Sequence, residues 1–201
     1  MKIKALALIL GSFCFIPLSA QTVDWSAVIN KAEKSVMFIE SGCTAFVIDA
    51  ARKYALTAAH CEAEGKMWVD RVEAKVVAKD TKKDLMVLEV PHLDPTRPAL
   101  RLARNPKRGQ NVMSIGYAMA LERPFFRIAH VSDDEVTIPD VPGGPFISVD
   151  AAFVGGQSGG PVVNEAGDVV MIVQRASNTV GIGVGADMIK ERMGRFFQGS
   201  K

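Results

Sequence analysis

The chain has 201 residues, a length that suits one domain, and its composition of 48% hydrophobic and 23% charged residues is that of a folded protein. The formal net charge is only +2, and the one basic stretch, from 97 to 108, is interrupted by prolines and reads as a solvated linker. The sequence therefore gives no basic face of the kind that nucleic-acid-binding proteins use, and it contains no repeat or low-complexity segment.

The first twenty residues predict a signal peptide cleaved after Ala20. A charged start is followed by an apolar run from 5 to 18 and by small residues at the cleavage point. The run is too short for a membrane span, although an uncleaved anchor stays the alternative. We expect a secreted or periplasmic protein with no stable membrane insertion after cleavage. Loss of Lys2 and Lys4 leaves as many basic side chains as the 22 acidic ones, so charge does not identify a partner.

Cysteine usage agrees with export. Cys14 leaves with the predicted signal peptide, and Cys43 and Cys61 remain. Two cysteines in an exported domain favour a disulfide between them, with two free buried thiols as the alternative. Closing a loop of this length stabilises a fold by about 3 kcal/mol in the loop-entropy model.

Short apolar runs separated by turn residues predict an all-β fold. A short helix capped by Asp24 is expected first, at 24–34. The first series of expected strands covers 35–40, 44–48, 54–57, 67–69, 71–78 and 85–90. After a proline-rich connection from 91 to 109, the second series covers 111–117, 125–131, 136–138, 146–149, 161–164, 169–174 and 180–185. A final helix is expected at 187–197. This pattern suits two barrels or a sandwich, and by itself does not choose between them.

His60 is the candidate general base among the three histidines, His60, His92 and His130. It follows an apolar strand and is surrounded by small residues, in Ala55-Leu56-Thr57-Ala58-Ala59-His60-Cys61. Small neighbours leave room for a substrate, and an imidazole titrates close to neutral pH, as a general base requires.

Ser158 is the candidate nucleophile because glycines flank it on both sides, in Gly155-Gly156-Gln157-Ser158-Gly159-Gly160-Pro161. Such a segment lets the backbone approach a substrate closely. The amides of Gly156 and Ser158 are then placed to stabilise an oxyanion. A glycine-rich hairpin turn is the alternative interpretation.

Asp84 is the candidate for the carboxylate that would orient the base. It stands at the start of an apolar strand, Asp84-Leu85-Met86-Val87-Leu88. Asp80 is its nearest rival, but it lies in a polar segment where we expect exposure to solvent.

Two of these segments carry a resemblance to a known superfamily. Thr57-Ala58-Ala59-His60-Cys61 and Gly156-Gln157-Ser158-Gly159-Gly160-Pro161 resemble the histidine and serine motifs of chymotrypsin-like serine peptidases, in the same chain order of His, Asp and Ser. The resemblance implies two six-stranded antiparallel β-barrels of the trypsin type in a peptidase domain at 21–201. The barrels would cover about 34–92 and 109–186, ahead of a C-terminal helix at about 187–197.

Within this superfamily, the sequence is most similar to the bacterial Deg-type (HtrA-like) peptidases, without a PDZ module. The similarity extends to the segments around Asp80 and Asp84, to Asp150-Ala151-Ala152 and to Gly181-Ile182-Gly183-Val184. It implies a serine endopeptidase that acts on polypeptides, and neither a metal nor a cofactor is expected. The oligomeric state stays open.

The resemblance also implies a specificity pocket. Ala152 would lie at its base, where an aspartate would select lysine or arginine, so a small or medium apolar P1 side chain is expected, with Phe153 beside it. The strand Val173-Gln174-Arg175 would pair with the substrate backbone. Gly183 and Val184 would form the opposite wall.

Three departures from the family pattern are informative. The cysteine pair is atypical of Deg-type members. Gln157 replaces the acidic residue of trypsin and cannot form a salt bridge with a new N-terminus, so no trypsin-style zymogen activation is expected. Gly155 replaces a proline, which predicts an oxyanion loop able to switch shape.

A silent binding protein on the same fold and an esterase with the same triad are the rival functions.

Overall fold

The computed structural model describes residues 23–176 and 179–199. The predicted signal peptide, residues 1–20, lies outside the described residues. Within the described part of the chain, no helix has the length and apolar character needed to cross a membrane.

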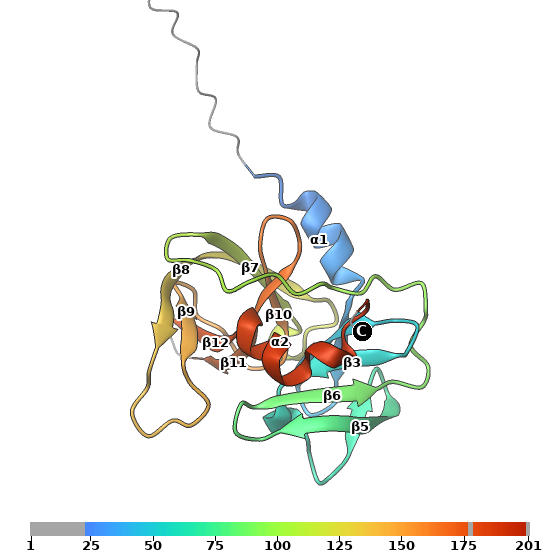
Figure 1. The fold of residues 1–201 in the computed structure, drawn as a ribbon. Coiled ribbons are helices and arrows are strands. Elements are labelled where there is room, and N and C mark those ends of the chain that lie inside the picture. Colours follow the sequence, from blue (N-terminus) through green and yellow to red (C-terminus); the bar gives the residue numbers. More distant parts are fainter. Residues whose placement is uncertain (1–22, 177–178, 200–201) are drawn as a thin grey trace, which may run out of the picture.

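The first half of the chain forms a closed antiparallel barrel (Figure 1). Its strands are β1 (Val36–Ile39), β2 (Cys43–Asp49), β3 (Tyr54–Thr57), β4 (Met67–Val69), β5 (Val72–Asp80) and β6 (Leu85–Glu89). They pair in the order β1-β2-β3-β6-β5-β4. All seven residues of β2 are buried, as are the first four of β6, because these strands lie in the interior of the molecule.

The second half forms another closed barrel, whose strands pair in the order β10-β11-β12-β9-β8-β7. These strands are β7 (Asn111–Gly116), β8 (Phe125–Val136), β9 (Phe146–Val149), β10 (Pro161–Val163), β11 (Val169–Ala176) and β12 (Gly181–Gly185). Two antiparallel six-stranded barrels confirm the predicted fold class and exclude the sandwich.

One hydrophobic cluster joins the two barrels. It contains Phe46 and Leu56 from the first barrel and Ile115 and Ile172 from the second, all fully buried. Because these side chains lose their contact with water only when the barrels pack together, the hydrophobic effect fixes the barrels relative to each other.

Two helices complete the fold. Helix α1 (Ser26–Glu33) packs on the core cluster through Val28 and Ala32. Helix α2 (Ala186–Met193) is followed by a 3₁₀ turn, η3 (Gly194–Phe196). Figure 1 shows α2, in red, between strands of the second barrel and β6 of the first, and it contacts β6, β11 and β12.

The connection between the barrels is bonded to both of them. The amide of Leu100 donates to the carbonyl of Val47, and the amide of Ala103 donates to that of Val169. The guanidinium of Arg97, in the same connection, donates to the carbonyl of Val36. The connection is therefore a surface strap, hydrogen-bonded to both barrels, and not only a solvated linker.

Some predicted elements are wrong in detail. No separate strand exists at 136–138, because β8 continues to Val136 through two register shifts against β9. The first helix begins at Ser26, and Asp24 accepts a hydrogen bond from its amide at 2.9 Å. Asp80 is not solvent-exposed: its side chain is only 12% accessible and lies 2.6 Å from Nε of Arg192.

Candidate active site

The pairing of β3 with β6 brings His60 and Asp84 together. In this antiparallel pair, Thr57 lies opposite Met86. His60 follows β3 in a short 3₁₀ turn, and Asp84 immediately precedes β6, so both residues lie at the same end of the pair. The register of two neighbouring strands thus decides their proximity.

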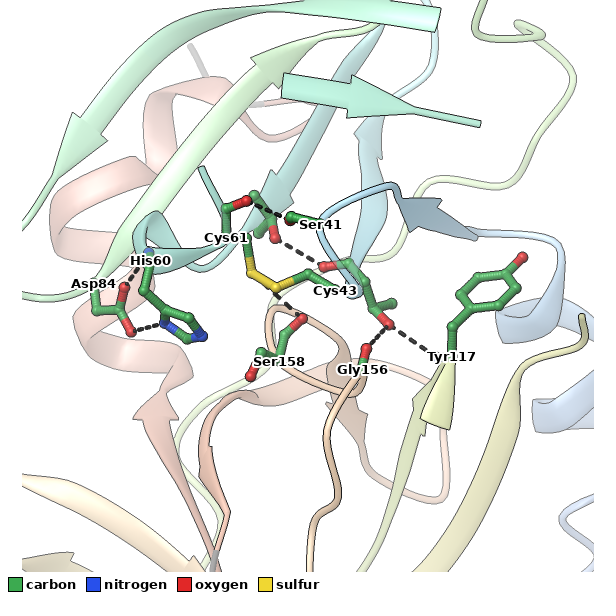
Figure 2. Close-up of a disulfide and its surroundings, with 10 residues drawn as sticks. Ser41, Cys43, His60, Cys61, Asp84, Tyr117, Gly156 and Ser158 are labelled. Carbon is green, nitrogen blue, oxygen red and sulfur yellow. Dashed lines mark hydrogen bonds and ion pairs between the residues drawn. A yellow bond between two sulfur atoms is a disulfide. The ribbon is translucent and has the colours of Figure 1, made fainter. Parts of the chain in front are cut away.

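Asp84 holds His60 with both carboxylate oxygens, one on the imidazole and one on the backbone amide. Its Oδ2 lies 2.7 Å from Nδ1 of His60, and its Oδ1 accepts the backbone amide of the same residue at 2.8 Å (Figure 2). A carboxylate on Nδ1 fixes the tautomer in which Nε2 is free to accept a proton. The His60 side chain is 45% accessible, whereas that of Asp84 is 22% accessible, so the imidazole faces the solvent and the carboxylate lies behind it.

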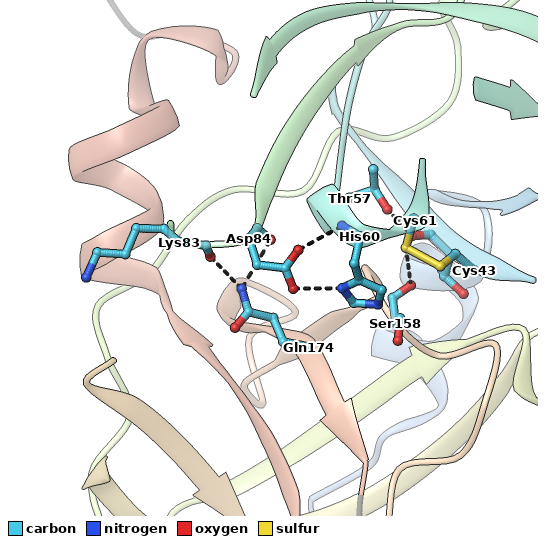
Figure 3. Close-up of polar contacts among 9 residues, drawn as sticks. Cys43, Thr57, His60, Cys61, Lys83, Asp84, Ser158 and Gln174 are labelled. Atoms are coloured by element: carbon cyan, nitrogen blue, oxygen red, sulfur yellow. Dashed lines mark hydrogen bonds and ion pairs between the residues drawn. A yellow bond between two sulfur atoms is a disulfide. The ribbon is translucent and has the colours of Figure 1, made fainter. Parts of the chain in front are cut away.

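Gln174 supports Asp84 from the second barrel. Its Nε2 donates to the carbonyl oxygens of Lys83 at 2.6 Å and of Asp84 at 3.1 Å (Figure 3). Asp84 has a φ of 54°, a left-handed conformation that is strained for a residue with a side chain. The buried amide of Gln174 helps to hold this backbone in place, and it couples β11 to the His60–Asp84 pair.

Ser158 lies next to the imidazole of His60, on a loop of the second barrel (Figure 3). The backbone of this loop leaves two amides free. Within the described residues, the amides of Gly156 and Ser158 donate no hydrogen bond, whereas the amide of Gln157 between them donates to Val154. Two unpaired amides beside a serine hydroxyl form the arrangement that stabilises an oxyanion.

The shape of this loop requires glycine at two positions. Gly156 has a φ of +96°, and a Cβ there would lie 2.0 Å from the carbonyl oxygen of Tyr117. Gly159 has a φ of +79°, and a Cβ would lie 2.3 Å from the carbonyl oxygen of Thr44. Gly159 thus allows the first barrel to approach the loop closely, and Gly156 allows the segment after β7 to do so.

Thr44 is the point at which the first barrel holds the loop. Its hydroxyl donates to the carbonyl of Gly156 at 2.7 Å and accepts the amide of Tyr117 at 2.9 Å, and its own amide donates to the carbonyl of Ser158 at 2.8 Å. Thr44 is completely buried, so these bonds are shielded from competing water.

Gln157 is buried beneath the loop and is 1% accessible. Its Oε1 accepts the amide of Val154 at 3.0 Å. Its Nε2 is a buried donor without a protein partner in the described chain. The carbonyl of Gly155 accepts the amide of Met119 at 2.6 Å and therefore points away from the amides that flank Gln157.

The predicted disulfide between Cys43 and Cys61 is present, with its Cα atoms 5.9 Å apart. It joins the start of β2 to the turn that carries His60. Sγ of Cys61 lies 3.8 Å from the carbonyl oxygen of Ser158. The covalent bridge therefore lies against the serine loop and restrains the backbone on one side of the imidazole.

The segment that leads to the predicted specificity pocket is fastened to β8. His130 and Asp150 repeat the contacts of the His60–Asp84 pair, with Nδ1 3.0 Å from Oδ2 and the backbone amide 2.6 Å from Oδ1. The amide hydrogen bond from His130 holds the pKa of Asp150 below its ordinary value. Arg127 donates to the carbonyl of Ala152 at 2.9 Å. The His130–Asp150 pair and the hydrogen bond from Arg127 thus fix the backbone around Ala152.

The residues expected around the pocket differ in their accessibility. Phe153, Val173, Gln174, Gly183 and Val184 are buried, Ala152 is half-buried and Arg175 is exposed. The ring of Phe153 fills the space over Gly181, where a Cβ would lie 2.4 Å from it, so this ring belongs to the core of the second barrel.

Sequence reasoning missed two residues of the site. Nothing in the sequence points to Thr44, and Gln174 is predicted only as part of a strand that pairs with the substrate backbone, whereas its side chain contacts the Asp84 segment. The bond from Thr44 to Gly156 spans 112 positions of sequence, so no local pattern signals it.

The chain matches a family model, the trypsin-like peptidase domain, over residues 43–172. A curated relative, the probable periplasmic serine endoprotease DegP-like of Pseudomonas savastanoi pv. phaseolicola (strain 1448A / Race 6), is 32% identical over 101 residues. That match covers 50% of this chain and 21% of the relative, so the matched half of the chain corresponds to about a fifth of the relative's length.

Solved structures share the fold. The active form of the Rv3671c protease from M. tuberculosis is 25% identical, with a TM-score of 0.69 and coverage of 98% of this chain and 96% of that chain. The HtrA-type protease AlgW with a tripeptide is 21% identical, with a TM-score of 0.74 and coverage of 87% and 64%. From the family match, which includes the histidine and serine motifs, this chain belongs to the trypsin-like peptidase domain family.

Proposed function

We propose that the chain is an exported serine endopeptidase with Ser158 as nucleophile, His60 as general base and Asp84 as the carboxylate that orients it. The observation that carries the proposal is the two-point contact between Asp84 and His60, next to a serine whose own amide and that of Gly156 are unpaired within the described residues. Membership of a peptidase family supports the same reaction.

In the proposed mechanism, Oγ of Ser158 attacks the peptide carbonyl carbon while Nε2 of His60 takes its proton. The amides of Gly156 and Ser158 bind the oxyanion of the tetrahedral intermediate. His60 then gives the proton to the leaving amine as the C–N bond breaks. Water hydrolyses the acyl-enzyme in the same way, and Asp84 stabilises the imidazolium in both halves of the reaction.

Within the described residues, the hydroxyl of Ser158 makes no hydrogen bond. Catalytic hydrogen bonds of free enzymes are often long and tighten when substrate binds. The proposal therefore includes a small rotation of the Ser158 side chain toward Nε2 of His60 as the first step.

For the acyl side of the substrate, we propose a small or medium apolar P1 side chain. Ala152 has no charge to attract lysine or arginine, and its half-buried methyl group is held in place through Arg127. The name of the DegP-like relative and the leader pattern of residues 1–20 support a periplasmic or secreted location.

The test is cleavage of casein and of peptide libraries by the wild type and by Ser158→Ala, with Ser132→Ala as a control at an exposed serine of β8. The nucleophile variant should lose about 10⁶-fold in kcat. A fluorophosphonate probe should label the wild type and the control but not the variant. Equal cleavage by Ser158→Ala would refute the assigned nucleophile.

Parallel assays separate the rival functions. Turnover of esters without cleavage of any peptide would identify an esterase. A wild-type protein that the probe never labels, and that cleaves nothing, would be a silent binding protein on this fold.

A further inference from the structure

A hollow of about 450 Å³ lies beside the serine loop, on the side of Ser158 that faces away from β11. Its wall includes Tyr117, which Figure 2 places beyond Gly156 on the far side of Ser158 from Asp84. Gln174, on β11, lies on the Asp84 side in Figure 3. If the acyl half of a substrate pairs with β11, the leaving-group half runs toward Tyr117.

A second hollow shares a wall residue with the first and borders the turn that carries His60. It has a volume of about 230 Å³ and is lined in part by Ser41 and Cys61. Glu40 lies in the walls of both hollows. Sγ of Cys61 lies 3.8 Å from the carbonyl oxygen of Ser158, so the smaller hollow, which Glu40 also lines, borders the serine loop. An extended peptide advances about 3.3 Å per residue, so a few residues cover the path along both hollows.

The larger hollow has an apolar wall. Phe38 and Tyr117 pack edge to face, with their ring centroids 5.5 Å apart, and Leu121 beside them is 48% accessible. The burial of Tyr117, and next the charge of Asp70, raise the pKa of its phenol, which stays neutral at physiological pH. These three side chains offer a surface for the aliphatic stem of a long side chain.

The charge of the hollow is mainly negative. Three carboxylates, those of Glu40, Asp70 and Glu122, line it against one guanidinium, that of Arg71. Both oxygens of Asp70 are engaged, by the amide of Phe38 and by Arg97. Glu40 uses only Oε1, which accepts the amide of Arg71 at 2.9 Å. The second oxygen of Glu40 has no protein partner in the described chain and is free to accept a hydrogen bond from a ligand.

We propose that this hollow is a specificity subsite that binds a lysine or arginine side chain from the leaving-group half of the substrate, with Glu40 as the residue that recognises its charge. The inference rests on the proposed peptidase function. A long cationic side chain fits both features of the hollow, because its stem packs on Phe38, Tyr117 and Leu121 while its head reaches a carboxylate. An acidic side chain would be repelled by the carboxylates of Glu40 and Glu122, whereas that of Asp70 is paired with Arg97.

The experiment uses peptides with one fixed acyl half and with arginine, norleucine or glutamate at each of the first three leaving-group positions. The wild type should show a higher kcat/KM for arginine than for norleucine at one of these positions, and a lower kcat/KM for glutamate. In Glu40→Gln the ratio of arginine to norleucine should fall about three- to fivefold, the size expected for an exposed ion pair. The glutamine keeps an oxygen for the amide of Arg71, so the loop retains its bond.

The matched control is Glu191→Gln, at an exposed residue of α2, which should keep the wild-type ratio. Added salt should reduce the preference of the wild type, because it screens exposed charges. A wild-type ratio within twofold of one at all three positions, or an unchanged ratio in Glu40→Gln, would overturn the subsite.

Failure of the subsite and failure of the peptidase give different results. Cleavage that depends on Ser158 but ignores the leaving-group residue refutes only the subsite. If no peptide is cleaved, leaving-group peptides are titrated into Ser158→Ala and followed by NMR. Shifts at Tyr117 and Leu121 that require arginine and weaken in Glu40→Gln support the subsite, and their absence overturns it.

Discussion

Thr44 shows how one buried hydroxyl organises the proposed oxyanion site. It lies on β2 of the first barrel, yet it bonds the carbonyl of Gly156 and the amide of Tyr117, both in the second. In the unfolded chain these groups would hydrogen-bond to water, whereas in the fold Thr44 is completely buried and water does not compete for its bonds. A hydroxyl that satisfies two buried groups costs more to remove than the net value of its bonds.

We therefore expect Thr44→Val, a change of nearly equal volume, to leave two buried polar groups unpaired and to lower the free energy of unfolding by about 1–3 kcal/mol. The loop amides would lose their fixed position, and kcat/KM should fall about 10- to 100-fold. Thr44→Ser keeps the hydroxyl and is the control. Chemical denaturation and peptide cleavage measure both effects, and a valine variant with full activity would contradict this role.

At the scale of elements, the His60–Asp84 pair depends on the turn between β5 and β6. Asp80 ends β5, and its Oδ1 accepts the amides of Lys82 and Lys83 just before Asp84. Its Oδ2 accepts from Arg192 on α2 at 2.6 Å. The terminal helix of the chain thus fastens the turn that presents the proposed catalytic carboxylate.

Burial acts to raise the pKa of Asp80, but the hydrogen bonds from Lys83 and Arg192 outweigh it, and the pKa lies below its ordinary value. A depressed pKa stabilises the fold above the unfolded-state value of about 3.9, and this contribution is lost as pH falls through the folded-state pKa. Because Arg192 is 41% accessible, the contribution is modest.

We expect Asp80→Asn to lower the stability at pH 7 by about 1 kcal/mol, which corresponds to about 2–4 °C in Tm. Asparagine keeps an oxygen for the two turn amides and removes only the charge. Thermal unfolding between pH 7 and pH 2 should show the difference shrinking below about pH 4, where the unfolded carboxylate begins to bind protons, and disappearing as pH falls below the depressed folded-state pKa. A variant as stable as the wild type at neutral pH would show that the Arg192 contact contributes nothing.

For the whole molecule, the sequence predicted the architecture better than the contacts that complete the site. The strands at Tyr54–Thr57, Met67–Val69 and Phe146–Val149 have their predicted bounds, because apolar runs there end at turn residues. The predicted strand ends at Val131 because the polar residues that follow break the apolar pattern. The observed strand β8 continues to Val136, with register shifts against β9. The contacts of Gln174 depend on packing between barrels, which local patterns do not encode.

The disulfide acts on the whole fold through the unfolded chain. Its loop has a sequence separation of 18, for which the loop-entropy model gives about 3 kcal/mol. We expect the double variant Cys43→Ser, Cys61→Ser to be less stable by about this amount in urea unfolding. Reduction of the wild type by dithiothreitol under partly denaturing conditions should reproduce the loss, and the double variant should not respond to it. An undiminished unfolding midpoint in the double variant would contradict the model.

The proposed triad is divided between the barrels, with His60 and Asp84 on the first and Ser158 on the second. Neither half of the polypeptide therefore holds a complete set of reacting groups. Two fragments, separated within the surface strap at Pro95 and each fused to one member of an interacting pair, would be inert alone and would hydrolyse peptides once the pair meets. The same architecture that builds the site would make this chain a split reporter of molecular encounters.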